Sequence, residues 1–272
     1  MSMDDMHRKK AKLESILADL GSVAVAFSAG VDSTFLLKVA HDTLGDDAAA
    51  VTAKLNSVPD RDIAEAEAFC EAEGIRHIIV EVDELSIDGF CDNPPDRCYL
   101  CKSRLFAEMI KAAENIGIKD LVDGSNMDDT GDYRPGLVAL KELGVRSPLK
   151  EAGLYKADIR ALSKELGLPT WDKPSFACLA TRFPYGEKIT KEKLRMVDLA
   201  EQKLIDMGFD QVRVRIHGDI ARIEIEPEQF GKILQPGNAS TLNTYMQELG
   251  FRYVALDLGG YVMGSMNRAL DN

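Results

Sequence analysis

A short apolar run that gives way at once to small residues is the feature that most constrains this chain. Residues 23–27 (Val-Ala-Val-Ala-Phe) are all apolar, as in a strand that is buried on both faces of a parallel sheet. Residues 28–33 are small or polar, and from Val31 to His41 apolar residues return at helical spacing. The stretch therefore predicts a strand, a tight turn and a helix. Because the first N–H groups of a helix have no partner within it, such a turn suits a phosphate group.

Strands and helices alternate along the chain as far as residue 168. Asp60 is the expected N-cap of one helix, and residues 82–97 form an expected excursion loop. The alternation is typical of an α/β fold with a doubly wound parallel sheet, whose ligand lies at the carboxyl ends of the strands. We predict further strands at 48–53, 77–80, 120–122 and 144–146, and helices at 5–20, 60–74, 98–116, 137–143 and 155–166.

The pattern changes after residue 168. Residues 169–188 contain three prolines and no clear periodicity, so we predict a long active-site loop. We place the domain boundary near residue 188, with the nucleotide domain over 1–188 and a smaller α+β domain over 189–272. In that second domain we predict helices at 189–207, 227–234 and 240–249, a hairpin of strands 211–216 and 220–226, and a strand at 253–258.

The charge and composition of the chain limit which classes of partner we expect. The chain carries 33 Lys and Arg against 45 Asp and Glu, a net charge of −12, which repels nucleic acid unless a local basic groove overcomes it. No apolar run approaches the roughly 20 residues that span a bilayer, and the N-terminus lacks an apolar signal core. We therefore expect a cytoplasmic protein with no membrane or nucleic-acid partner. Five cysteines in a reducing compartment favour metal binding or catalysis over disulfides.

The turn after the first strand resembles the PP-loop of ATP pyrophosphatases, whose signature is Ser-Gly-Gly-x-Asp-Ser. Here the residues are Ser28-Ala29-Gly30-Val31-Asp32-Ser33. Ala29 stands where the family usually has glycine, and a positive φ there would challenge the match. The resemblance implies that ATP is cut between its α and β phosphates and that an acceptor is adenylated. Ser28, Gly30 and Ser33 would hold phosphate oxygens, and Asp32 would organise Mg²⁺ on the pyrophosphate.

A second polar loop follows the strand predicted at 120–122. Gly124, Ser125 and Asn126 leave the same edge of the sheet as the PP-loop, so we predict a second wall of the ATP site. An ordinary turn is the alternative, because loops of this composition usually are turns. Arg134 lies further along and is a candidate clamp for a phosphate or carboxylate.

Three cysteines are candidates for chemistry. Cys98 and Cys101 are separated by one helical turn, close enough to share a metal, and Cys178 lies in the loop 169–188. Two incidental thiols are the alternative for the pair. Cys70 belongs to a helical run and is predicted to pack, and Cys91 is incidental or a fourth ligand.

Together these motifs resemble the LarE family of sulfur transferases over nearly the whole chain. The resemblance is carried by the PP-loop, the Cys-Leu-Ala-Thr-Arg run from Cys178 to Arg182, and the strand over 212–217. It implies an enzyme that uses ATP and Mg²⁺ to adenylate a carboxylate of pyridinium-3,5-biscarboxylic acid mononucleotide and convert it to a thiocarboxylate. Cys178 and Asp32 would carry the chemistry.

The family divides by its source of sulfur. In members with one cysteine, that cysteine gives up its sulfur and becomes dehydroalanine, whereas members with three bind a [4Fe-4S] cluster that carries an extra sulfide. This chain has Cys98, Cys101 and Cys178. Three thiolates leave one iron open for a sulfide, so we favour the cluster over sacrifice of Cys178. Zinc at the same thiols is the competing metal.

The resemblance also assigns residues to the substrate. Arg182, Arg213 and Arg215 would bind the phosphate of the mononucleotide, and exposed arginines on a sheet face are the alternative for the last two. Glu201 and Glu224 are weaker candidates for a metal at subunit contacts, with solvated surface acids favoured instead. The family tends to assemble through its C-terminal domain, so a homo-oligomer is expected and residues 189–272 would serve substrate binding and assembly.

Three other functions compete with this interpretation. A PP-loop tRNA thiolase needs a basic groove and typically a second Cys-x-x-Cys, and the sequence shows neither. An amide-forming PP-loop synthetase would leave the cysteines without a purpose. A structural zinc module on a degenerate nucleotide fold would bind zinc without cleaving ATP.

Overall fold

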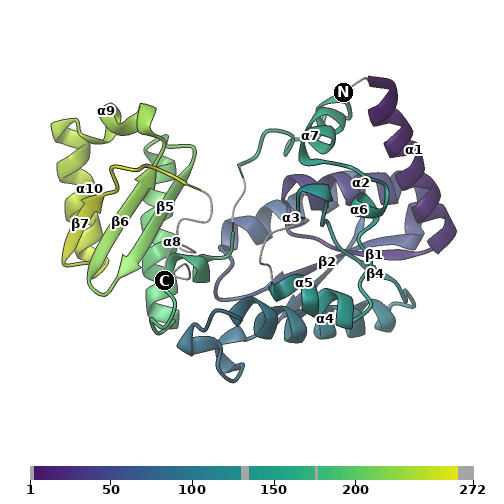
Figure 1. Cartoon of the computed structure of the whole chain (residues 1–272), viewed down its shortest axis with the longest axis horizontal. Coiled ribbons are helices and arrows are strands. Elements are labelled where there is room, and N and C mark those ends of the chain that lie inside the picture. The colour runs from purple at the N-terminus through teal and green to yellow at the C-terminus, as the bar shows by residue number, and fades with distance from the viewer. Residues whose placement is uncertain (1–2, 130–134, 175–176, 263–272) are drawn as a thin grey trace. The chain divides into compact units, whose positions relative to one another are not determined.

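The computed structural model describes residues 3–129, 135–174 and 177–262 (Figure 1). The chain divides into two compact units. The first comprises Met1–Glu84 and Cys98–Phe176, and the second comprises Leu85–Arg97 and Ala177–Asn272. Part of the predicted excursion loop and the end of the predicted active-site loop are thus grouped with the C-terminal residues. The predicted boundary near residue 188 stays a prediction.

The first unit contains a parallel sheet, as predicted. Its strand order is β3-β2-β1-β4, and each neighbouring pair is parallel. The strand predicted at 144–146 was wrong, because only one bridge joins Arg146 to Val122. Pro148 begins a short helix directly afterwards, and proline has no N–H with which to extend the ladder. The strands are β1 (Val23–Ala26), β2 (Ala48–Lys54), β3 (Arg76–Glu81) and β4 (Leu121–Val122).

Helices cover both faces of this sheet, which confirms the doubly wound α/β prediction. Alternate residues of β1 enter different cores: Val23 and Val25 pack with α1, α2 and α7, whereas Ala24 packs with α4 and α5. Figure 1 shows α4 and α5 on one side of the sheet and α2 and α7 on the other. The helices are α1 (Met3–Leu20), α2 (Val31–Leu44), α3 (Asp60–Glu73), α4 (Arg97–Asn115), α5 (Pro135–Glu142), α6 (Pro148–Glu151) and α7 (Lys156–Glu165).

Two local details refine the predictions. Asp60 is the first residue of α3, and Pro59 is its N-cap, so the predicted cap was wrong by one position. An acid in the first turn is still favourable beside the helix dipole. Cys70 is buried in the core, as predicted, and burial raises the pKa of its thiol to about 12.

The order of the strands places the predicted phosphate site. From β1 the chain moves outward to β2 and β3, and it later returns to β4 on the other side of β1. The carboxyl end of β1 is therefore a topological switch point, where the loops after β1 and β4 diverge and leave room for a ligand.

The second unit contains the predicted smaller sheet. The hairpin of β5 (Val212–His217) and β6 (Ile220–Ile225) is antiparallel, and β7 (Tyr253–Leu256) joins β6 in parallel. Thr190 caps α8 (Lys191–Asp206) by accepting a hydrogen bond from the Lys193 N–H. The last helices are α9 (Phe230–Ile233) and α10 (Pro236–Glu248). The latter begins four residues earlier than predicted because proline suits a first helical position.

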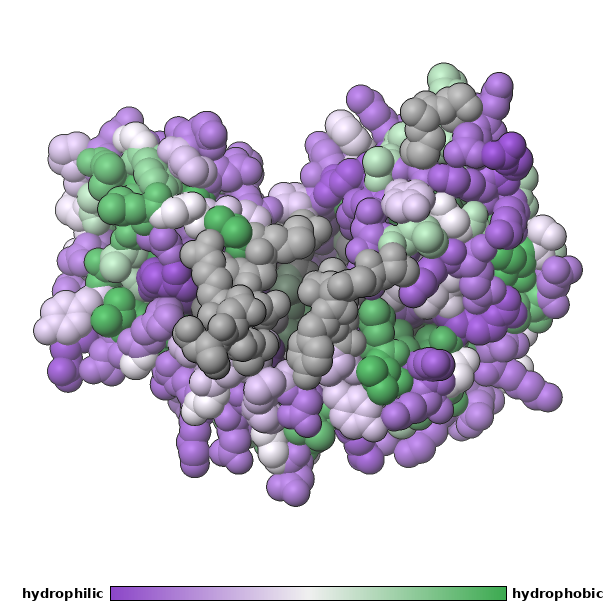
Figure 2. Space-filling model, viewed as in Figure 1, coloured by the Kyte–Doolittle hydropathy of each residue, from purple (hydrophilic) through white to green (hydrophobic). Residues whose placement is uncertain are grey.

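Short 3₁₀ turns complete the described chain. They are η1 (Gly45–Asp47), η2 (Glu84–Ser86), η3 (Phe90–Asp92), η4 (Met127–Asp129), η5 (Leu179–Arg182) and η6 (Pro227–Gln229). Within residues 3–129, 135–174 and 177–262, no helix is both long and apolar enough to cross a membrane. The side chains on the face drawn in Figure 2 are mostly hydrophilic, with hydrophobic residues in small patches.

Candidate active site

The PP-loop residues form a compact turn between β1 and α2. The Ser33 hydroxyl lies 3.1 Å from the Ser28 hydroxyl and 3.3 Å from both the Ser28 N–H and the Gly30 carbonyl. Gly30 is the N-cap of α2 and provides no side-chain cap. The first N–H groups of α2 therefore remain available at the carboxyl end of β1, where an anion would be stabilised by them and by the helix dipole.

Ala29 adopts the positive φ that would have challenged the match. Its φ is 51°, in the left-handed region, and its side chain is buried. The left-handed conformation costs an L-residue about 1–2 kcal/mol, which explains why glycine is usual at this position in the PP-loop. The turn nevertheless forms here with alanine, whose side chain is the smallest after that of glycine.

The loop after β4 packs directly on the PP-loop. A Cβ on Gly124 would lie 3.1 Å from the Ser33 nitrogen, so a side chain there would press the backbone of this loop against the start of α2. Asn126 is buried and donates from its side chain to Asp32 over 3.2 Å. Ser125 instead donates to Asp123. Arg134, the predicted clamp, lies outside the described residues.

Two lysines that the sequence analysis did not identify contact residues of the PP-loop. Lys156, the first residue of α7, forms an ion pair with Asp32. Lys173 donates to the Ala29 carbonyl over 3.0 Å and pairs with Glu65. Polyphosphate sites need cations, and that requirement was the signal that could have directed attention to lysines near the sheet's carboxyl edge.

A surface depression near the sheet edge does not coincide with these groups. It has a volume of about 510 Å³ and lies between α3 and the ends of β2 and β3. Its charged lining comprises Lys54 and three acids, Asp60, Glu67 and Glu81. Such a lining repels phosphate, and none of the predicted site residues contributes to it.

The predicted metal-binding cysteines are divided between the units. Cys98 and Cys101 lie near the start of α4, half-buried, in the first unit, and Cys178 is exposed in the second. Cys91, half-buried, lies in the second unit, and its thiol donates to the Leu85 carbonyl. Over residues 3–129, 135–174 and 177–262, no three His, Cys, Asp or Glu side chains form a metal-binding group.

Cys178 is the N-cap of the 3₁₀ turn η5, in which Leu179, Ala180 and Arg182 are buried. The Cys178 carbonyl accepts hydrogen bonds from the Thr181 N–H and hydroxyl over 3.0 and 2.9 Å. Arg182 donates to the Ala177 carbonyl over 3.0 Å. The exposed residue Cys178 thus belongs to a backbone whose carbonyls are fixed by hydrogen bonds from Thr181 and Arg182.

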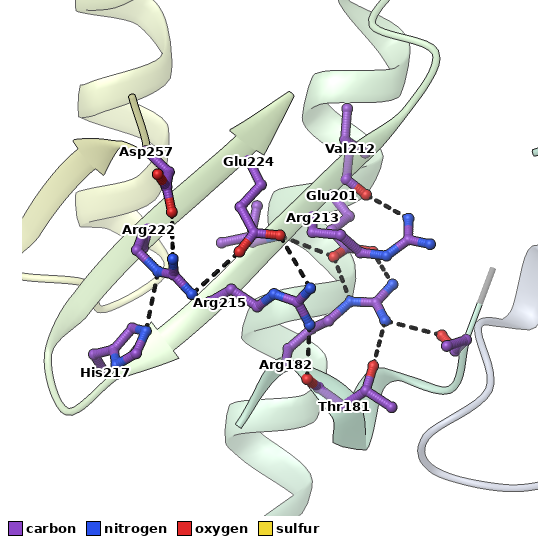
Figure 3. A network of polar contacts seen from close by, with 12 residues as sticks. Thr181, Arg182, Glu201, Val212, Arg213, Arg215, His217, Arg222, Glu224 and Asp257 are labelled. Carbon is purple, nitrogen blue, oxygen red and sulfur yellow. Dashed lines mark hydrogen bonds and ion pairs between the residues drawn. The ribbon is translucent and has the colours of Figure 1, made fainter. Parts of the chain in front are cut away.

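Arg182 belongs to a buried network of charges in the second unit (Figure 3). Its guanidinium pairs with both oxygens of Glu201 over 2.7 and 2.9 Å, and Glu201 also accepts the Val214 N–H. Burial by itself raises the pKa of Glu201, but Arg182, together with Arg213 and the Val214 N–H, outweighs burial, so the pKa lies below its ordinary value. Most donors of Arg182 are therefore engaged by the protein.

The same network contains the other predicted arginines. Arg215 donates to the Thr181 carbonyl over 2.8 Å and pairs with Glu224 over 3.0 Å, while Arg222 pairs with Glu224 over 3.1 Å. Arg213 and Arg215 are buried, so the alternative of exposed arginines was wrong. The favoured alternative for Glu201 and Glu224, solvated surface acids, was also wrong, because both are fully buried as partners of arginine.

Among the residues that the structure describes, this network contains more arginines than carboxylates. Burial, and then the nearby Arg182, lower the pKa of Arg213 to about 10, and the Arg213 guanidinium lies 5.1 Å from the centre of the Tyr261 ring. Burial and Arg222 likewise lower the pKa of His217. An anion placed beside Arg213 would relieve this excess. The four arginines are Arg182, Arg213, Arg215 and Arg222, and the three carboxylates are Glu201, Glu224 and Asp257.

Known proteins were then compared with the chain. A pyridinium-3,5-bisthiocarboxylic acid mononucleotide synthase of Lactiplantibacillus plantarum is 42% identical over 269 residues, which cover 98% of this chain and 97% of that protein. The chain belongs to the LarE family. An uncharacterized protein of Synechocystis sp. is 43% identical over 265 residues, covering 97% of this LarE-family chain and 99% of that protein.

A more distant relative supports the fold of the LarE-family enzyme. A tRNA-specific 2-thiouridylase of Azorhizobium caulinodans is 28% identical over 226 residues, covering 66% of this chain and 57% of that protein. No family model matches the chain. The relatives and the parallel sheet together confirm a PP-loop fold and an enzyme that uses ATP, with sulfur transfer as its activity class.

Proposed function

We propose that this LarE-family enzyme converts a carboxylate of pyridinium-3,5-biscarboxylic acid mononucleotide to a thiocarboxylate at the expense of ATP. The observation that carries the proposal is the 42% identity, over 98% of the chain, to a synthase named for the dithiolated product. The compact PP-loop at the carboxyl end of β1 supports it. A small mononucleotide is also a better acceptor than tRNA for a chain with a net charge of −12.

The first step activates the carboxylate. One carboxylate oxygen attacks the α-phosphorus of ATP, the bond to the β-phosphate oxygen breaks, and pyrophosphate leaves with its electrons. Ser28, Ser33 and the N-terminal N–H groups of α2 would hold the departing pyrophosphate. Asp32 would bind Mg²⁺, which neutralises the phosphate charge. Asp32 pairs with Lys156, so this lysine lies beside the carboxylate that would hold Mg²⁺.

The second step replaces oxygen by sulfur. A sulfur nucleophile attacks the acyl carbon of the adenylate, and AMP departs with the electrons of the broken C–O bond. Thiolates are the protein ligands of iron–sulfur clusters, and Cys98, Cys101 and Cys178 would be the ligands of a [4Fe-4S] cluster in this enzyme. Bound there, the cluster would supply a sulfide from an iron that no protein thiolate occupies.

The mononucleotide phosphate is proposed to bind at the charge network of the second unit. Arg213 is the best candidate because its lowered pKa reflects burial beside other arginines. Arg182 and Arg215 already hold carbonyls of the Cys178 turn. They would contribute mainly by fixing that turn and by raising the local positive charge.

The test is direct conversion of the mononucleotide under anaerobic conditions. With ATP and Mg²⁺, mass spectrometry should detect replacement of one oxygen by sulfur, together with AMP and pyrophosphate. Asp32→Asn should lower the rate at least about 100-fold by removing the metal ligand. Asp42→Asn changes an acid at the other end of α2, paired with Lys38, and should leave the rate unchanged. Formation of AMP without any thiolated product would contradict the proposal.

The source of sulfur is tested separately. About four irons and four labile sulfides per chain, lost on replacing Cys98, Cys101 or Cys178 by Ala, would support the cluster. Zinc in place of iron would support the competing metal. Loss of one sulfur's mass from Cys178 after a single turnover would instead identify that residue as the donor.

A further inference from the structure

The backbone of the Cys178 turn is held by side chains from a distant segment as well as by Arg182 and Arg215. Arg97 donates to the Ala180 carbonyl over 3.0 Å. Asn93 donates from its side-chain amide to the Phe183 and Pro184 carbonyls over 3.3 and 2.6 Å. These donors and acceptors all belong to the second unit.

Asn93 and Arg97 also contact each other. The Asn93 side-chain oxygen accepts a hydrogen bond from the guanidinium of Arg97, so one amide orients the arginine and holds two carbonyls. Both residues are buried, with exposed fractions of 0% and 4%. We call this pair the Asn93–Arg97 clamp. The side chain of Arg97 is therefore fixed in one orientation. Breaking one of its contacts would leave a buried polar group without that hydrogen bond, which is costly.

The main chain around Asn93 is built for this arrangement. Asn93 has a φ of 53°, in the left-handed region that asparagine tolerates better than most residues. Its carbonyl accepts the Gly186 N–H over 3.0 Å, and the Cys91 carbonyl accepts the Ile189 N–H over 2.9 Å. The clamp and these main-chain bonds therefore secure the chain from Ala180 to Ile189, on the C-terminal side of Cys178.

We propose that the Asn93–Arg97 clamp positions Cys178 for sulfur transfer. This rests on the proposed function, in which Cys178 carries or ligates the sulfur. The thiol is exposed, whereas Ala180 two residues later is fully buried and anchored by Arg97. Arg97 also immediately precedes Cys98, another proposed ligand. The clamp is a positioning device and has no part in the bond changes themselves.

The consequence for the rate follows from geometry. A displacement of a reacting group by about 1 Å can cost about 100-fold in rate. Removing the guanidinium of Arg97 leaves the Ala180 carbonyl with the longer, 3.4 Å bond from the Phe183 N–H, and it removes the contact that orients Asn93. The turn can then move while the PP-loop, in the other unit, is unchanged, so ATP binding should be preserved.

The central variant is Arg97→Met, which keeps the aliphatic length and removes the donors. We expect sulfur transfer to fall about 10- to 100-fold with the KM for ATP within about twofold of wild type. Hydrogen exchange in peptides covering 178–189 should accelerate at least about 10-fold, whereas peptides from α10 should not change. Arg97→Lys, which can still donate to Ala180, should recover part of both losses. Iron retained on anaerobic purification should fall as well.

Two further variants separate positioning from general instability. Asn93→Gly keeps the left-handed backbone available and removes only the side chain, so it tests the clamp if Arg97→Met does not fold. Leu242→Ala, in the core of α10, lowers the stability of the second unit without touching the turn. Suppose that Leu242→Ala lowers the melting temperature as much as Arg97→Met does. If it also loses as much sulfur transfer, the loss reflects general instability and the proposal fails.

The outcomes distinguish this inference from the proposed function. If Arg97→Met and Asn93→Gly fold and show wild-type exchange over 178–189 and wild-type transfer, the clamp does not position Cys178. If wild-type protein transfers no sulfur to the mononucleotide, the proposed function fails. In that case the exchange measurements on the unloaded protein still decide whether the clamp holds the turn.

Discussion

Replacing Glu201 by glutamine would test whether the buried charge network holds the second unit together. Glu201 and Arg182 are each 1% exposed and share two hydrogen bonds, and Glu201 also accepts the Val214 N–H over 2.9 Å. Glutamine keeps the volume and one acceptor but leaves the arginine charge uncompensated. Breaking a buried pair in this way costs about 3–5 kcal/mol. That is a large share of the roughly 5–15 kcal/mol that stabilises a typical protein.

A matched pair on the surface provides the control. Arg146 and Glu151 make the same two-point contact, but their side chains are 42% and 36% exposed. Glu151→Gln should therefore cost less than about 1 kcal/mol. The comparison changes the same chemical group and the same two-point contact in both places. The two sites differ in burial and in the Val214 N–H that Glu201 also accepts.

The assay must report on each unit separately. The chain has one tryptophan, Trp171, which lies in the first unit, so its fluorescence during urea unfolding should change little in Glu201→Gln. Hydrogen exchange in α8 should show the loss. With a slope of about 1–2 kcal/mol per molar urea, a loss of about 3 kcal/mol lowers the midpoint of the second unit by roughly 1.5–3 M. Equal costs for Glu201→Gln and Glu151→Gln would refute the reasoning.

The same carboxylate predicts a pH dependence. Its folded-state pKa lies below the ordinary value of 4.5, so its contribution to stability is complete above that pH and is lost as the pH falls through the lowered folded-state value. The Glu201→Gln variant lacks this contribution. Its free energy of unfolding should therefore vary less with pH in the acid range than that of wild type.

Three further predictions concern the glycines, the strained alanine and the histidines. Ala29→Gly should raise the free energy of unfolding by about 0.5–1 kcal/mol, because relief of the left-handed strain exceeds the added freedom of the unfolded chain; a lower melting temperature by circular dichroism would contradict this. Gly124→Ala should raise the KM for ATP at least about 10-fold, since its Cβ would lie 3.1 Å from the backbone of α2, whereas Gly237→Ala, with nothing within 4 Å, should have no effect on ATP. Burial lowers the pKa of both His77 and His217 below 6.5. The free energy of unfolding should therefore fall as the pH drops below 6.5, by at most about 1.4 kcal/mol per pH unit for each ring. Urea midpoints that do not change between pH 6.5 and pH 5 would count against this prediction.

Local patterns account for what sequence reasoning predicted well. The PP-loop could be recognised because its six residues are contiguous and follow a wholly apolar strand, so strand, turn and helix are specified within a dozen positions. The packing of Cys70 followed in the same way from its place in a helical run. The positive φ at Ala29 could also be anticipated as a possibility, because the PP-loop usually has glycine at that position.

Contacts between distant residues account for what it did not predict. The charges of Arg213 and Glu201 gave no sign of burial, because burial depends on which elements cover β5 and α8. Lys156 could be assigned to the PP-loop only once α7 was placed beside Asp32.

The phosphate-binding turn and the alternation of strands and helices around it follow from local sequence patterns. The way in which the turn of Cys178 is held depends on the fold, since Arg97 and Ala180 lie 83 positions apart. A hydrogen bond depends on a few ångströms of separation and on direction. Sequence periodicity specifies the face on which a residue lies, and the folded chain alone specifies which partner faces it.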